Sequence, residues 1–150
     1  MDAEVYPKPE VENFIRDNFL PVKIHIKEQP ATFERFGAQW TPTIAVLDPS
    51  GAKRHQFEGY LPSDDFLAQL KLGLAHAAFA KQDWEAAERM YRELVDQMPE
   101  TDAAPEALYW AGVAEYKRTG DAKALGGTAA QFRNRYSQST WAKKASVWGA

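Results

Sequence analysis

The chain has 150 residues, 45% of them hydrophobic and 26% charged, which is typical of a folded globular protein and not of a disordered or fibrous one. Its net charge of −3 provides no positive field that could hold a nucleic-acid backbone or an anionic membrane surface, so neither partner is expected. Cysteine is absent, which excludes disulfides, thiolate metal sites and thiol nucleophiles within these residues.

The apolar stretches are only a few residues long, which is too short for a membrane span. The first twenty residues also carry five carboxylates, which a secretory signal peptide does not (Asp2, Glu4, Glu10, Glu12 and Asp17). The sequence therefore predicts a cytoplasmic location.

Helical and strand periodicities alternate in the first part of the chain. Apolar residues at spacings of three and four predict a short helix over residues 10–18. The alternation Val-Lys-Ile-His-Ile over residues 22–26 predicts a strand with one polar face. A second short helix is expected over residues 31–36, because Gly37 can adopt the left-handed conformation that ends it.

A hairpin and a longer helix are expected next. Residues 43–47 (Thr-Ile-Ala-Val-Leu) are nearly all apolar, which suits a central strand covered on both faces. Residues 48–51 (Asp-Pro-Ser-Gly) have proline and glycine at the positions a turn favours, and residues 54–58 are expected to return as a second strand. Ser63 is a good N-cap for a helix whose apolar stripe reaches Leu74.

Residues 22 to about 74 resemble the C-terminal half of a thioredoxin fold. The resemblance is carried by Trp40-Thr41-Pro42-Thr43 and by the strand and turn that follow, which are similar to the cis-proline loop, strand and hairpin of that family. It implies a cis peptide bond before Pro42 and a peptide-binding site at Trp40, Thr41, Pro42 and Thr43, where the backbone of Thr41 would pair with an extended peptide. Alternatively, Pro42 only keeps the start of the strand from pairing at an edge.

The resemblance also shows what these residues lack. A thioredoxin fold has two further strands upstream, with a Cys-x-x-Cys motif after the second, and neither is present. In the family that second strand lies between the strands that residues 22–26 and 43–47 resemble. Without it, buried backbone groups of both would be unpaired, at a cost of about 1–3 kcal/mol each.

Three explanations stay open. In the first, Met1 is an internal methionine of a longer protein, and residues 1–11 are similar to the segment after the Cys-x-x-Cys motif of bacterial thioredoxin-like proteins. In the second, the short chain completes its sheet by rearrangement, strand exchange or dimerisation. In the third, the half-fold is an adaptor that has lost its redox chemistry. We favour the first as the origin of the sequence.

Strand patterns disappear after Leu72 and alanine becomes frequent. Helices are expected over residues 73–81 and 84–98, with Asp83 as N-cap, and again over residues 106–117 and 122–136. A last helical segment, residues 139–148, would cap the stack. Asp83 and its counterpart Asp121 are 38 residues apart, and the pattern resembles tetratricopeptide repeats, whose period is about 34 residues.

The predicted fold class is therefore α/β: a truncated thioredoxin-like domain over residues 1–71, followed by an α-helical tetratricopeptide-like (TPR-like) hairpin stack over residues 72–150. Two repeats and a cap are fewer than an independent solenoid needs, so we expect the helix that begins at Ser63 to be shared by the two parts.

Aromatic and histidine side chains are the remaining candidates for a site. Tyr109, Trp110 and Tyr116 could line a peptide groove in the repeats, although burial between helices is the ordinary use of such residues. Each histidine stands alone, without a second ligand at the spacing of a metal site (His25, His55 and His76). No metal, cofactor or catalytic residue is predicted.

The sequence as given predicts a redox-inactive thioredoxin-like protein with TPR-like repeats, which acts as a binding module for a protein or an extended peptide. The enzyme alternative is a thiol-disulfide oxidoreductase whose Cys-x-x-Cys motif lies upstream of Met1. If Met1 is the true start, unpaired sheet edges are also expected to drive formation of a homodimer.

Overall fold

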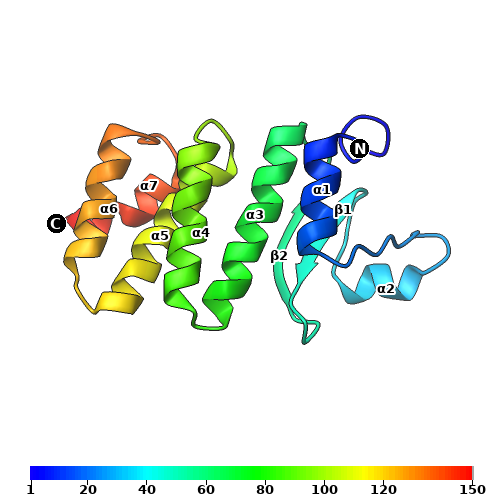
Figure 1. Cartoon of the computed structure of the whole chain (residues 1–150), viewed down its shortest axis with the longest axis horizontal. Helices are drawn as coiled ribbons and strands as arrows, with labels where there is room; N and C mark the ends of the chain where they lie inside the picture. Colours follow the sequence, from blue (N-terminus) through cyan, green and yellow to red (C-terminus); the bar gives the residue numbers. More distant parts are fainter. Residues whose placement is uncertain (150) are drawn as a thin grey trace. The chain divides into compact units, whose positions relative to one another are not determined.

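The computed structural model describes residues 1–149 and consists of two compact units, Met1–Leu67 and Ala68–Ala150. Helix α3 begins in the first unit and continues into the second. The elements, shown in Figure 1, are α1 (Pro9–Asn18), α2 (Pro30–Arg35), β1 (Thr43–Leu47), β2 (Lys53–Glu58), α3 (Ser63–Ala80), α4 (Trp84–Gln97), α5 (Ala103–Thr119), α6 (Lys123–Asn134), α7 (Thr140–Ala145) and the 3₁₀ helix η1 (Ser146–Gly149).

The first unit is built around a two-stranded antiparallel sheet, β1 and β2. Ile44 and Val46 of β1 share one face with Phe57 of β2, because side chains alternate along each strand. The Phe57 ring packs edge-on against Phe66 at the start of α3, with 5.7 Å between ring centroids. Tyr6 contacts the same Phe66 ring at 5.5 Å. This face of the hairpin therefore forms the core of the unit.

Most of the predicted elements of this unit are confirmed. The structure contains the helices predicted over residues 10–18 and 31–36 and both strands of the hairpin. The strand predicted over residues 22–26 is wrong: this segment belongs to no sheet, Ile26 lies in a turn, and Val22 is 74% exposed. The alternating pattern gives a tendency to extend, but a strand also needs a neighbour that pairs with its backbone.

The Asp48 carboxylate holds the turn of the hairpin together. It accepts hydrogen bonds from the backbone N–H groups of Ser50 (2.9 Å) and Ala52 (3.1 Å) and from Nε of Arg54 (2.7 Å). The hydrogen bond from the Ser50 hydroxyl is the largest effect on the pKa of Asp48. Burial raises that pKa. The hydrogen bonds from Ser50, Arg54 and the two backbone N–H groups outweigh burial and hold the pKa of Asp48 well below its ordinary value.

We expect Asp48→Asn to lower the Tm at about pH 7, because asparagine keeps an acceptor for the turn but loses the ion pair with Arg54. A lowered folded-state pKa stabilises the fold fully above the unfolded value of about 3.9, and this contribution is lost as the pH falls below it. The Tm difference between variant and wild type should therefore shrink towards about pH 2. Asp17→Asn, at an exposed carboxylate of α1, is the control; a Tm difference at Asp48 that does not change with pH would contradict this account.

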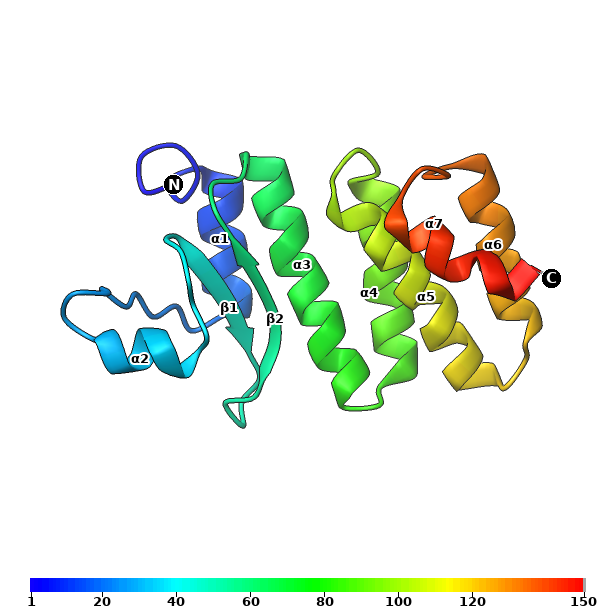
Figure 2. The ribbon, with the colours of Figure 1, turned by 180° about the vertical axis from the view of Figure 1, so that it is seen from behind.

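The second unit is entirely helical and has an alanine-rich core. Helices α4 and α5 pack side by side, α5 packs on α6, and α7 contacts both α5 and α6 (Figure 2). The fully or nearly fully buried residues of this core include Leu72, Ala75, Ala87, Tyr91, Leu94, Ala104, Ala107, Leu108, Ala111, Ala114 and Phe132. Small side chains allow these helices to approach closely, so changes in volume between them are costly.

The helices predicted for this unit are confirmed to within a few residues, with two differences. The segments predicted on either side of Leu72 are one continuous helix, α3, because Gly73 lies in a helix interior and does not end it. The last predicted segment is divided into α7 and η1. The expected N-cap is confirmed: the Asp83 side chain accepts a hydrogen bond from the backbone N–H of Ala86 at 3.1 Å.

Candidate functional site

The four predicted peptide-binding residues form the loop that leads into β1. Two hydrogen bonds hold this loop: the Thr43 hydroxyl donates to the carbonyl of Trp40 (2.6 Å), and the N–H of Gly59 donates to the carbonyl of Pro42 (2.8 Å). The peptide bond between Thr41 and Pro42 is cis. The loop therefore has a defined conformation at the start of the strand, while the Trp40 side chain is 68% exposed.

Some backbone groups of this loop have no hydrogen-bond partner among the described residues. Within residues 1–149, neither the N–H nor the carbonyl of Thr41 has a hydrogen-bond partner. Thr41 is also exposed, so its backbone is accessible from solvent. An exposed backbone group of this kind can pair with an incoming extended chain without first breaking a bond within the protein.

One side of β1 also has backbone groups without a hydrogen-bond partner among the described residues. The carbonyl of Pro42 accepts from Gly59, so the backbone groups of alternate residues of β1 face β2 and those between them face away. Among the described residues, β1 has no neighbour other than β2. We call the outward-facing residues the open β1 edge: Thr43, Ala45 and Leu47.

The three aromatic groove candidates lie on α5, where the rings of Tyr109 and Trp110 contact each other (5.4 Å between centroids) and Tyr116 stands apart from them. Tyr109 stacks on Trp148 (4.5 Å between centroids), and Trp110 packs edge-on against Phe79 (5.2 Å). Both are half-buried in a cluster of rings, and the indole N–H of Trp110 is buried without an acceptor in the part of the chain that the structure describes. Tyr116 lies two turns further along α5 and is 37% exposed.

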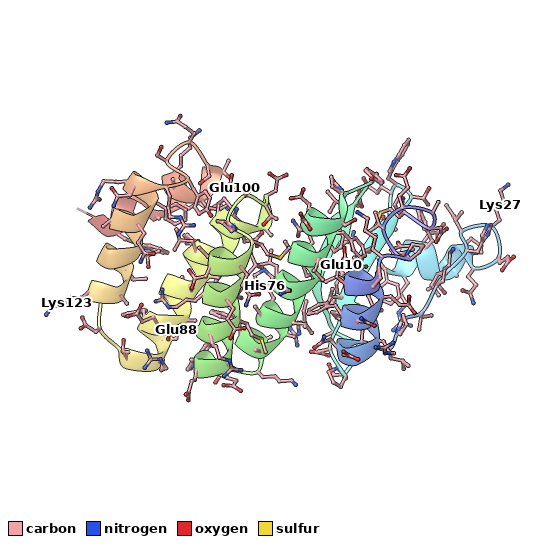
Figure 3. The ribbon with its side chains drawn as sticks, turned by 45° about the horizontal axis from the view of Figure 1, so that its top comes forward. Glu10, Lys27, His76, Glu88, Glu100 and Lys123 are labelled. Carbon is pink, nitrogen blue, oxygen red and sulfur yellow. The ribbon has the colours of Figure 1, made fainter. Side chains whose placement is uncertain are left out.

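One of the three histidines, His76 of α3, contacts two polar side chains of neighbouring helices (Figure 3 labels His76). Its Nδ1 lies 2.6 Å from the hydroxyl of Tyr91 on α4, and its Nε2 lies 3.1 Å from Oε1 of Glu106 on α5. An ionised Glu106 can only accept, so Nε2 carries a proton; in the neutral imidazole, Nδ1 then accepts from the Tyr91 hydroxyl. We call this set the Tyr91–His76–Glu106 cluster.

The cluster joins three helices, and its tyrosine is closed off from solvent. Tyr91 is 0% exposed, and burial, followed by the charge of Glu106, raises the pKa of its hydroxyl. A hydroxyl that is both buried and harder to ionise cannot reach or attack a substrate. The only signal in the sequence is that His76 and Glu106 each stand among alanine and other apolar residues of their helices.

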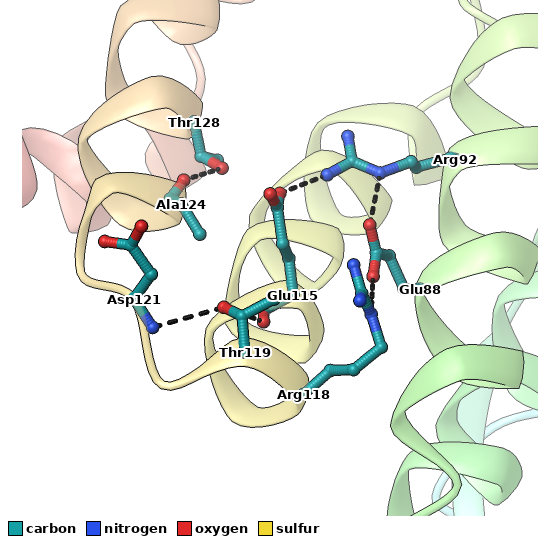
Figure 4. A network of polar contacts seen from close by, with 8 residues as sticks. All are labelled: Glu88, Arg92, Glu115, Arg118, Thr119, Asp121, Ala124 and Thr128. Carbon is teal, nitrogen blue, oxygen red and sulfur yellow. Dashed lines mark hydrogen bonds and ion pairs between the residues drawn. The ribbon is translucent and has the colours of Figure 1, made fainter.

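A second polar network joins α4 and α5 (Figure 4). Glu88 accepts from Nε of Arg92 (3.0 Å) and from Nε of Arg118 (2.8 Å), and Arg92 also pairs with Glu115. Burial opposes ionisation of Glu88, but the hydrogen bonds from Arg118 and Arg92 outweigh it and hold the pKa of Glu88 below its ordinary value. The charges of this network are already neutralised by one another.

Two open pockets lie in the helical unit. One of about 420 Å³ borders the network and is lined by charges of both signs, among them Arg92, Glu115 and Asp121. The other, of about 480 Å³, includes Tyr136 and Trp141. Neither includes a predicted site residue.

Across residues 1–149, no group of three His, Cys, Asp or Glu side chains could hold a metal ion. None of the described helices has the length and apolar character needed to cross a bilayer.

Comparison with known proteins bears on the first part of the chain. Residues 1–73 match the model of a family described as a thioredoxin-like domain, which includes the loop before β1, the hairpin and the start of α3. No curated protein and no solved structure gives a significant match to the chain. The resemblance based on Trp40-Thr41-Pro42-Thr43 is thereby supported at the level of the domain: residues 1–73 are similar to the thioredoxin-like domain family.

Proposed function

We propose that the chain is a redox-inactive protein-binding module, whose thioredoxin-like domain binds an extended peptide along the loop at Thr41 and the open β1 edge. The observation that carries the proposal is the run of unpaired backbone groups that begins at Thr41 and continues along β1, next to the exposed Trp40 ring. Addition of a strand to a free sheet edge is a common mode of peptide recognition. The chain has no cysteine with which to exchange disulfides.

The two parts of this site would contribute differently to binding. Each residue of the open β1 edge offers one N–H and one carbonyl, and every hydrogen bond formed there contributes about 0.5–1.5 kcal/mol. These contacts do not depend on the peptide's side chains. Trp40 adds apolar surface that a bound side chain can cover, which is how an edge of this kind selects one peptide over another.

The helical unit is proposed to be TPR-like and to provide a second protein-binding surface. Two helix hairpins, α3–α4 and α5–α6, support this, with turns at Asp83 and Asp121 that lie 38 residues apart. The positions at which the repeat pattern favours alanine, an aromatic and an apolar residue are buried here (Ala87, Tyr91 and Leu94).

Peptide binding can be tested by calorimetry with a panel of extended peptides of about eight residues, in which valine and threonine alternate. We expect Trp40→Ala to raise the Kd of the best peptide about tenfold, a loss of about 1.4 kcal/mol. Tyr60→Ala is the matched control, because Tyr60 is also an exposed aromatic residue of this unit but lies beyond β2. An equal loss for both variants, or no binding by any peptide, would rule out the proposed site.

The match of residues 1–73 to a thioredoxin-like domain favours a second candidate, a thiol-disulfide oxidoreductase whose cysteines lie outside these 150 residues. In that case a substrate would be held against Thr41 and Pro42 while an upstream cysteine attacks it. The intact mass of the protein from its natural source, before and after reduction and alkylation, separates the two. A mass near 16.9 kDa without alkylation supports the binding module, and a larger mass that gains two alkyl groups only after reduction supports the enzyme.

A further inference from the structure

The pocket that includes Tyr136 and Trp141 is lined by the loop before α5 and the loop before α7. Its volume is about 480 Å³, which is within the range of pockets that bind ligands. The two aromatic rings line it together with Pro99 and Pro105. All four residues are half-buried, so each keeps part of its apolar surface open to a ligand. We call this site the Tyr136–Trp141 pocket.

Contacts within the chain hold both rings of this pocket in place. The Tyr136 hydroxyl donates to the carbonyl of Pro99 (2.6 Å) and accepts from Nη2 of Arg135 (3.0 Å). On Trp141, the ammonium nitrogen of Lys144 lies 3.9 Å from the ring centroid. Rings that are already fixed lose little side-chain freedom when a ligand binds, which favours affinity.

The charged residues that line the pocket are both acidic. Glu100 and Asp102 lie in the loop before α5 and are exposed. The Glu100 side chain has no hydrogen-bond or ion-pair partner among the described residues (Figure 3 labels Glu100). Arg135 and Lys144 contact the two rings but do not line the pocket. A ligand of complementary charge therefore carries a basic group.

Two hydroxyl groups of the pocket are able to donate to a ligand. Thr140 is exposed, and its hydroxyl has no partner in the part of the chain that the structure describes. The Ser139 hydroxyl accepts from the backbone N–H of Ala142 (3.1 Å), which leaves its own proton available. The pocket thus combines apolar ring faces with hydrogen-bond donors, which suits a ligand whose carbonyl groups lie beside apolar rings.

Among the common modes of peptide recognition, one fits this lining. Addition of a strand requires a sheet edge, and residues 68–149 contain no strand. Docking of an amphipathic helix requires a long apolar groove, whereas here carboxylates and hydroxyls interrupt the apolar surface. Recognition of a phosphate requires an arginine cluster, and the lining charges have the opposite sign. A proline-rich segment, by contrast, docks on aromatic rings and has carbonyl groups that are free to accept.

We propose that the Tyr136–Trp141 pocket binds a proline-rich segment of a partner protein, with a flanking arginine of that segment paired to Glu100 and Asp102. The proline rings cover Tyr136 and Trp141, and carbonyl groups of the segment accept from the two hydroxyls. Arginine suits the carboxylates because its planar guanidinium forms two parallel hydrogen bonds with such a group. The inference rests on the proposed function, since it names the protein-binding surface of the helical unit and the partner it takes.

Calorimetry of the full chain tests the pocket with two blocked peptides of about eight residues, made of proline and leucine with one arginine at either the first or the last position. We expect Trp141→Ala to raise the Kd of the better peptide at least about tenfold, because one of the two ring faces is lost. Glu100→Lys should raise that Kd about tenfold, but by less than about twofold when leucine replaces the arginine. Replacing every proline by alanine should weaken binding at least about tenfold.

Two further variants serve as controls. Asp96→Lys adds the same charge at an exposed position of α4 outside the pocket, and Tyr60→Ala removes an exposed aromatic ring of the first unit. Neither should change the Kd of the proline peptides. Circular dichroism checks that each variant is folded. Because Glu100 is exposed, Glu100→Lys tests the pocket even if Trp141→Ala does not fold.

Three results would overturn the proposal: no saturable binding of either peptide by the wild type, equal binding of the alanine peptide, or a Kd that neither Trp141→Ala nor Glu100→Lys changes. None of them touches the site in the first unit, which Trp40→Ala and the valine–threonine peptides test separately. Binding of the valine–threonine peptides without binding of the proline peptides would support the site at Thr41 and reject this one.

Discussion

Gly112→Ala is expected to destabilise the helical unit by about 1–3 kcal/mol, although alanine is ordinarily the better helix former. A Cβ atom at this position of α5 would clash with Oγ1 of Thr128 on α6 and lie 2.8 Å from its Cβ. Thr128 is 2% exposed, and its hydroxyl donates to the carbonyl of Ala124 at 2.9 Å. Because a buried β-branched side chain has little freedom at χ1, the two helices must separate to admit the methyl group.

Gly127→Ala is the matched control for this prediction. Gly127 lies in the interior of α6, and a Cβ atom there would have no heavy atom within 4 Å. The same substitution should therefore stabilise the unit by up to about 1 kcal/mol. Urea denaturation followed by circular dichroism measures both. If Gly112→Ala were as stable as Gly127→Ala, the close approach of α5 and α6 would be wrong.

The contact between position 112 of α5 and Thr128 of α6 can also be tested by moving the glycine from α5 to α6. Thr128→Gly removes every atom that the methyl group at position 112 would meet closest, so the double variant with Gly112→Ala should recover part of the loss. The coupling energy from the double-mutant cycle should be favourable and within the range of about 0.5–3 kcal/mol that residues in contact show. A purely additive result would mean that the two residues do not meet.

Tyr91→Phe is the second substitution with a large expected effect, a loss of about 1–3 kcal/mol. Phenylalanine keeps the ring, which is fully buried, and removes only the hydroxyl, so little cavity is formed. Nδ1 of His76 then loses the donor that lies 2.6 Å away, at a part-buried position where an acceptor left without a partner is costly. The loss follows from an unsatisfied acceptor and not from poorer packing.

Tyr116→Phe, on the exposed part of α5, is the control and should change the free energy of unfolding by less than about 0.5 kcal/mol. A second arm replaces both partners: His76→Leu combined with Tyr91→Phe removes donor and acceptor together, and it should be less destabilising than the sum of the single changes. If Tyr91→Phe is as neutral as the control, the Tyr91–His76–Glu106 cluster does not contribute to stability.

The features that the sequence predicts correctly depend on residues close to one another along the chain. The turn at residues 48–51, the N-cap at Asp83 and the periodicity of the helices are all read within one or two turns of backbone. Trp40-Thr41-Pro42-Thr43 is a similarly local motif, and it is sufficient to predict the similarity of residues 1–73 to a thioredoxin-like domain. The error at residues 22–26 has the opposite origin, since alternation is local but strand pairing is not.

Composition and local pattern thus determine the elements of this protein, the absence of thiol chemistry within these residues and the loop in which Thr41 lies. The tertiary structure alone decides which backbone groups stay unpaired along β1, that His76 meets Tyr91 and Glu106, and that Gly112 must remain without a side chain. These contacts join residues that are 15 or more positions apart in the sequence. Their geometry depends on how whole helices and strands pack, which no local periodicity encodes.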